Sequence, residues 1–162
     1  MAVSAYEVIS TQTLGSAASS VTFSSIPQTY TDLVLVVSHD VTADAISGVQ
    51  FNGDTASNYS ASYVWGNGTN AYSGRETGAA SAFAFYAAAA SGFATAIIQV
   101  MNYSNATTYK TLLSREADAS VESMAVAGLW RSTAAITSMV LLRRSGNFAT
   151  DSTFTLYGIK AA

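Results

Sequence analysis

The sequence predicts an all-β fold, an antiparallel β-sandwich of jelly-roll type with about ten strands, as one domain over residues 1–162. Three observations predict it. Apolar residues recur mostly with a period of two, which is the pattern of strands buried on one face. Turn signals separate these segments at short intervals. No stretch carries a sustained apolar stripe at helical spacing or an internal repeat of the kind that builds solenoids and propellers.

The first half of the chain contains five segments with strand patterns, at 6–8, 21–23, 33–37, 49–51 and 59–65. The third is a continuous Leu/Val run, as expected of a strand buried on both faces. Asn52-Gly53 follows the fourth and predicts a tight turn, because both residues tolerate positive φ. Residues 66 to about 78 are rich in Gly, Asn and Ser and predict the longest loop.

The second half contains one ambiguous segment, residues 79–90. Its alanines favour a helix, whereas Phe83 and Phe85 alternate with alanine as in a strand. We predict a strand, with a short helix at the alanine run as the alternative. Further strands are predicted at 94–103, 109–114, 124–130, 136–143 and 153–159. The first and last strands of the chain could then pair at one edge of a sheet.

The composition excludes several classes of function. Only 10% of residues are charged, against about 25% in typical domains, so Ser, Thr and small residues must form much of the surface. Such a surface suits flat, close contact with other surfaces. The net charge of −3 argues against nucleic acid as a partner, because that affinity depends on clustered Lys and Arg. The one adjacent basic pair, Arg143-Arg144, is predicted to lie in solvent at a strand end.

Membrane insertion and covalent cross-links are also not expected. Residues 82–101 are largely apolar, but they are rich in Ala, include Ser91, Gly92 and Gln99, and lack basic flanks. The chain has no cysteine, which rules out disulfides and Cys-bearing zinc sites. Its first residues do not have the pattern of a secretory signal, so we expect synthesis and folding in a cytoplasm.

The residue types that carry catalysis form no set, so the sequence predicts no enzyme and no cofactor. His39 is the single histidine, followed by Asp40, and is predicted to lie at the surface. No glycine pattern for binding phosphate occurs. Glu116, Asp118 and Glu122 lie close together; solvated charges at strand ends are the favoured interpretation, with a Ca²⁺ site as the alternative.

The strongest binding signal is a group of aromatic residues around a Gly/Asn loop. Aromatic faces beside amides suit stacking on sugar rings or burial in a protein partner. The alternative is that Tyr63 and Trp65 share one strand face and line the core. The candidate contact residues are Tyr59, Tyr63, Trp65, Asn67, Asn70 and Tyr72. Trp130, by contrast, continues an apolar strand and is predicted to lie in the core or between subunits.

Five blocks of the sequence, in this order, carry a resemblance to a known group of proteins. They are SVTFSSIPQTYTDLVLVV at 20–37, FNGDTASNYS at 51–60, MNYSNATTYKTLLSR at 101–115, GLWRSTAAITSMVLL at 128–142 and FTLYGIKAA at 154–162. In these blocks the chain resembles small structural proteins of tailed bacteriophages, especially phages of marine bacteria and cyanobacteria. Each block alone is weak, and their order is the specific part.

The resemblance implies a virion component, either a head decoration or fibre protein or a tail-fibre or tail-tip module. It implies other capsid or tail proteins as partners, and it transfers no catalytic or ligand residues to this sequence. Most such proteins form symmetric oligomers, so we expect a homo-oligomer, preferably a homotrimer. The alternative function is a carbohydrate- or receptor-binding module for host attachment, with a host surface glycan as the partner.

Overall fold

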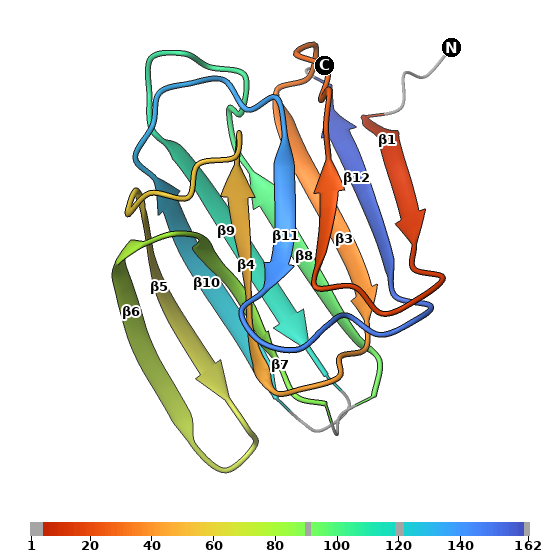
Figure 1. Ribbon diagram of the computed structural model, residues 1–162. Helices are drawn as coiled ribbons and strands as arrows, with labels where there is room; N and C mark the ends of the chain where they lie inside the picture. The colour runs from red at the N-terminus through yellow and green to blue at the C-terminus, as the bar shows by residue number, and fades with distance from the viewer. Residues whose placement is uncertain (1–4, 90–91, 119–121, 161–162) are drawn as a thin grey trace.

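The computed structural model describes residues 5–89, 92–118 and 122–160. Every regular element in these ranges is a β-strand, and the twelve strands form two antiparallel sheets packed face to face (Figure 1). The predicted antiparallel β-sandwich is therefore confirmed. The jelly-roll type stays a prediction.

The larger sheet has eight strands in the order β1-β12-β3-β8-β9-β10-β5-β6. Their bounds, in chain order, are β1 Tyr6–Thr13, β3 Asp32–His39, β5 Tyr59–Gly66, β6 Ala71–Ala79, β8 Ala94–Val100, β9 Lys110–Ala117, β10 Ser123–Trp130 and β12 Thr153–Ile159. The smaller sheet has four strands in the order β2-β11-β4-β7, namely β2 Ser20–Phe23, β4 Ala45–Phe51, β7 Ala82–Ala87 and β11 Met139–Arg143.

The main core lies between the sheets and contains the side chains that alternation places inward. Its centre includes Phe51 of β4 and Trp130 of β10, whose ring centroids are 5.4 Å apart. Trp130 is 2% exposed, so its predicted place in the core is confirmed. The Leu/Val run of β3 is also buried, since Leu33 and Leu35 are fully covered and Val34, on the opposite face, is only 5% exposed.

The two ends of the chain meet in one sheet, where β1 and β12 run antiparallel at the edge (Figure 1). Tyr6 pairs with Ile159, and Thr13 pairs with Thr153. This confirms the predicted pairing of the first and last strands.

The Asn52-Gly53 turn connects the two sheets. Both residues have positive φ, 53° and 69°, and the Asp54 amide donates to the Phe51 carbonyl at 2.9 Å. The tight turn predicted here is confirmed. It carries the chain from β4 in the small sheet to β5 in the large one, so the strands on its two sides are not neighbours.

The predicted loop from residue 66 to about 78 is wrong, because most of it is strand β6. The connection from β5 to β6 is only the short loop 67–70. The sequence of β6 has no apolar alternation, because β6 is an edge strand whose small and polar side chains are mostly exposed. Pairing with β5 along its whole length defines it, with Gly74 opposite Tyr63.

The ambiguous alanine-rich segment is strand β7, as predicted; residue 90 of that range lies outside the described residues. Together with β8 it accounts for most of the apolar stretch 82–101. Among the residues that the structure describes, no helix is long and apolar enough to span a bilayer.

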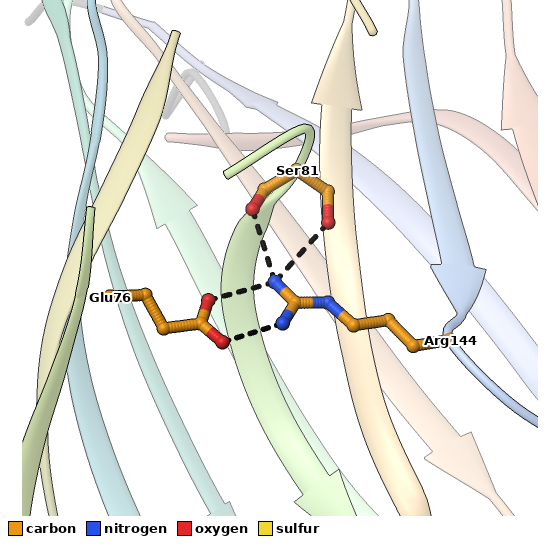
Figure 2. A network of polar contacts seen from close by, with 3 residues as sticks. All are labelled: Glu76, Ser81 and Arg144. Carbon is orange, nitrogen blue, oxygen red and sulfur yellow. Dashed lines mark hydrogen bonds and ion pairs between the residues drawn. The ribbon is translucent and has the colours of Figure 1, made fainter. Parts of the chain in front are cut away.

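An ion pair ties the free edge of the large sheet to the small sheet. The Arg144 guanidinium, directly after β11, donates to both carboxylate oxygens of Glu76 on β6, at 2.6 and 2.8 Å (Figure 2). It also donates to the carbonyl and hydroxyl oxygens of Ser81, just before β7, at 3.2 and 3.4 Å. One side chain therefore fixes β6 and the start of β7 beside each other.

Candidate binding site

A cavity of about 370 Å³ lies where β7, at the edge of the small sheet, packs over β5, β9 and β10. We call it the aromatic pocket. The residues that line it are Ile46, Tyr63, Trp65, Phe83, Tyr86, Glu116, Glu122, Ser123 and Met124. Its volume is in the range of small-molecule sites.

Stacked rings form the wall between the two sheets. Tyr63 of β5 and Phe83 of β7 lie almost parallel, with centroids 4.7 Å apart and planes 11° apart. The Tyr63 ring also covers Gly74 of β6, where a Cβ atom would lie only 2.5 Å from the Tyr63 hydroxyl. The absence of a side chain at Gly74 thus gives the Tyr63 ring its place.

A second ring stack extends this wall to the free edge of the large sheet. Trp65 and Tyr72 are directly paired on β5 and β6, with centroids 4.2 Å apart and planes 21° apart. Tyr72 is 43% exposed, and Trp65 is half-buried. Tyr63 and Trp65 share the inner face of β5, as predicted, but part of their surface faces a cavity.

A β-bulge in β7 sets the shape of this strand beside the pocket. Gly48 of β4 pairs with Phe83 while Ser47 pairs with Phe85, so Ala84 is an extra residue in β7, a β-bulge. Phe83 and Phe85 are both buried, and Tyr86 lines the pocket.

A carboxyl group is buried at the inner wall of the pocket. Glu116 of β9 is 5% exposed, and its Oε1 atom makes no hydrogen bond in the part of the chain that the structure describes. Burial, and then the negative charges of Asp118 and Glu122, raise the pKa of Glu116 to about 8, against a lowering by Arg143. The predicted solvated state of the Glu116 charge is wrong.

The other two acids of that cluster, Asp118 and Glu122, are hydrogen-bonded to each other. The Glu122 amide donates to an Asp118 carboxylate oxygen at 3.1 Å, and the Asp118 amide donates to the Glu122 carbonyl at the same distance. In the ranges 5–89, 92–118 and 122–160, no three His, Asp or Glu side chains gather as a metal site would require. Glu116, Asp118 and Glu122, which all lie in these ranges, therefore do not come together as the Ca²⁺ alternative required.

His39 lies in the core, so its predicted surface position is wrong. It is 1% exposed, and its ring stacks on Phe85 with centroids 4.7 Å apart. Neither ring nitrogen makes a hydrogen bond within the described ranges. Burial, helped by the positive charge of Arg143, lowers the pKa of His39 to about 4. The imidazole is therefore neutral at pH 7 and has no access to a substrate.

Arg143 is also buried, at 5% exposure, and does not lie in solvent as predicted. Its guanidinium donates to the carbonyls of Ala43 and Ala45, at 2.5 and 2.9 Å, and to the Ser47 hydroxyl at 3.0 Å. These bonds anchor the segment before β4 to the end of β11. Its neighbour Arg144 is exposed, as predicted, and makes the ion pair of Figure 2.

The structure divides the predicted contact residues into three groups. Tyr63, Trp65 and Tyr72 lie together at the pocket and its rim. Tyr59 is fully buried and receives a hydrogen bond from the Phe51 amide at 3.0 Å, so its predicted contact role is wrong.

Asn67 and Asn70 belong to the turn between β5 and β6. The Asn67 side-chain oxygen accepts hydrogen bonds from the amides of Thr69 and Asn70, at 3.2 and 2.9 Å. The side chain of Asn67 therefore stabilises the turn.

The sequence prediction missed Phe83, Tyr86, Glu116 and Met124. The alternation of Phe83 and Phe85 was visible, but nothing in the sequence placed β7 over β5. Glu116 lies on the inner face of β9, whose polar and apolar residues do not alternate cleanly, so no periodicity marked it as buried.

A second surface lies on the opposite face of the large sheet, which the small sheet does not cover. Strand register aligns two rows of outward side chains across β8, β9, β10, β5 and β6. The rows are Gln99-Leu113-Ala127-Ser62-Arg75 and Ile97-Arg115-Ala125-Val64-Ser73. We call this surface the outer groove; its volume is about 820 Å³.

The outer groove combines exposed apolar side chains with positive charge. Val64 is 56% exposed and Leu113 50% exposed. Ala125 and Ala127 lie between them as small side chains at the bottom. Arg75 and Arg115 are the charged side chains among its lining residues, which include no acid.

Comparisons with known proteins give no family. No protein-family model matches the chain, and no curated protein matches it. Among solved structures, exo-inulinase from Aspergillus awamori aligns with a TM-score of 0.45 and 14% identity, over 95% of this chain and 29% of that one. Scytalido-glutamic peptidase, solved with a peptide-based transition-state analogue, aligns with a TM-score of 0.29 and 10% identity, over 94% and 66%.

The chain thus spans less than a third of the exo-inulinase. At these TM-scores neither likeness bears on function.

Proposed function

We propose that this chain is a structural protein of a tailed-bacteriophage virion, made in the host cytoplasm, that acts through contacts with other capsid or tail proteins. The order of the five sequence blocks supports the assignment to a phage virion. The outer groove supports a role in protein–protein contacts. Val64 and Leu113 expose apolar surface in a groove with two arginines and no acid. A partner segment with apolar side chains and carboxylates complements it.

The proposal assigns no catalytic activity to the chain. Its single histidine is buried against Phe85, where it cannot meet a substrate. Homo-oligomerisation, with a trimer preferred, is part of the proposal and is tested by the mass of the purified protein in solution.

The experiment makes the same substitution, Val to Glu, at two positions and measures whether each variant is incorporated into particles. Val64→Glu places a charge in the outer groove, whereas Val8→Glu places one on β1, outside it; the parent side chains are 56% and 60% exposed. Exposed substitutions change stability by about 1 kcal/mol or less. We expect wild type and Val8→Glu to co-purify with particles and Val64→Glu to be lost. Absence of the wild-type protein from particles refutes the proposal.

One observation favours a second candidate function, attachment to a host receptor or carbohydrate. Tyr63 and Trp65 line a cavity, and Tyr72 is exposed at its rim. Trp65→Ala should then reduce host-cell adsorption or a glycan-array signal while the protein stays folded. Unchanged adsorption would remove the pocket as the attachment site.

A further inference from the structure

The buried Glu116 carboxyl is the starting point. It is more than nine-tenths buried, it lines the aromatic pocket, and its Oε1 atom makes no hydrogen bond to the described residues. Burying a carboxyl without a partner is costly, so such a group points to a role other than folding. Arg143 makes no hydrogen bond to this oxygen in the described part of the chain; its guanidinium donates instead to the Ala43 and Ala45 carbonyls.

The rest of the lining shows which chemistry fits. The described residues of the lining carry two carboxyl groups, those of Glu116 and Glu122, and no Lys or Arg side chain. Four aromatic rings, Met124, Ile46 and Ser123 supply the remaining contact surface. Aromatic faces attract cations through their quadrupoles, most strongly where water is excluded, and a thioether is polarisable.

A neutral sugar fits this lining less well. Sugar hydroxyls need several donors and acceptors around them; here the hydroxyls of Tyr63, Tyr86 and Ser123, the Trp65 indole and the two carboxyls can serve, whereas Ile46, Phe83 and Met124 offer none. The lining side chains include no amide and no guanidinium. A compact cation with apolar substituents uses both the rings and the carboxylates.

We propose that the aromatic pocket binds an organic ammonium group, with Glu116 and Glu122 as counter-charges and the rings of Tyr63, Phe83 and Tyr86 around its carbon substituents. The group can belong to a small molecule or to a lysine side chain of a partner protein. The inference specifies the ligand class of the receptor-attachment candidate and does not depend on the virion assignment.

Binding of a cation is coupled to ionisation of Glu116. Burial first, and then the negative charges of Asp118 and Glu122, raise the pKa of Glu116, and Arg143 lowers it, with a result of about 8. Tyr86, on β7, and His39, on β3, are both neutral near pH 7, since burial raises the pKa of Tyr86 and lowers that of His39. An ammonium ligand favours the ionised carboxylate, so binding releases a proton and affinity rises with pH up to about 8.

The test is calorimetric titration of the full chain with choline and with the neutral isostere of choline in which carbon replaces nitrogen. Titrations at about pH 6 and about pH 9 and constant ionic strength give the proton linkage. A peptide with one free lysine forms a second arm and distinguishes a protein source from a small molecule. Glu116→Gln removes the charge at nearly constant shape, and Glu7→Gln on the distant β1 is the matched control.

We expect choline or the lysine peptide to bind at least about tenfold more tightly at the higher pH. The neutral isostere should bind weakly. Glu116→Gln should lower affinity by at least about tenfold at the higher pH and abolish the pH dependence, while Glu7→Gln has no effect. Failure of both cations to bind, or equal binding of the isostere, overturns the proposal. If the protein nevertheless binds a glycan on an array, the receptor-attachment function is retained and only the cation proposal fails.

Discussion

The Tyr63 ring lies flat on the Phe83 ring, with 4.7 Å between centroids and 11° between planes. The two residues come from different sheets, so this stack is both a contact across the sandwich and one wall of the aromatic pocket. Gly74 makes it possible, because the Tyr63 ring occupies the space that a side chain at Gly74 would take.

Replacement of Gly74 by alanine should therefore displace the Tyr63 ring. A Cβ atom there would lie 2.5–2.7 Å from the Tyr63 hydroxyl oxygen and two carbons of its ring. We expect a loss of about 1–3 kcal/mol in the free energy of unfolding, measured by urea denaturation. Gly15→Ala is the control, because a Cβ at Gly15 meets nothing within 4 Å. Equal effects of the two substitutions would contradict the role of Gly74.

The strands of the pocket were partly predictable from the sequence. Alternation along β5 placed Tyr63 and Trp65 on one face, and the structure confirms that face. The partner Phe83 could not be predicted, because its position depends on how β7, in the other sheet, crosses β5. Strand β6 was missed because an edge strand needs no apolar face.

The ion pair between Arg144 and Glu76 should stabilise the fold measurably. Its geometry is bidentate, and the two side chains are only 29% and 23% exposed. A double-mutant cycle with Arg144→Gln and Glu76→Gln should give a coupling free energy of about 1 kcal/mol. The pair of Lys160 and Glu7 on β1, which is more exposed at 39% and 35%, should give a smaller coupling free energy. A larger coupling for the exposed pair would contradict this ranking.

His39 should make the protein less stable in acid. Its pKa is about 4 in the folded chain and 6.5 in the unfolded chain, so the unfolded chain takes up the proton first. The contribution of His39 to the free energy of unfolding, about 3 kcal/mol, is fully present above about pH 6.5 and is lost as pH falls toward 4. We expect His39→Leu to flatten that part of the urea-unfolding profile relative to wild type. An identical pH slope in the variant would show that His39 is not responsible.

The sequence placed His39 and Glu116 in solvent, and the reason for the error is their neighbours in the sheet. His39 pairs with Ala94, and Glu116 pairs with Ala96, both on β8. Such small side chains leave room between the sheets for long polar ones. The alanines are visible in the sequence, but the register that sets them beside His39 and Glu116 is not.

Glu116 should make the protein less stable at high pH, which is the opposite of the effect of His39. Its pKa is higher in the folded chain than in the unfolded one, so stability falls as pH rises from about 4.5 to about 8. Glu116→Gln should stabilise the protein at about pH 9, by on the order of 3 kcal/mol, and change little at about pH 4. Thermal or urea unfolding at the two pH values measures this, and a variant that is less stable at the higher pH would contradict it.

The proposed binding of a cation in the aromatic pocket depends most directly on the ionisation of Glu116. A ¹³C NMR titration that follows its carboxyl carbon, without and with saturating tetramethylammonium, measures that ionisation at the atom concerned. We predict a midpoint near 8 in the free protein, and a midpoint at least about one pH unit lower with the cation bound. A midpoint near 4.5 without ligand, or one that the cation leaves unchanged, would contradict it.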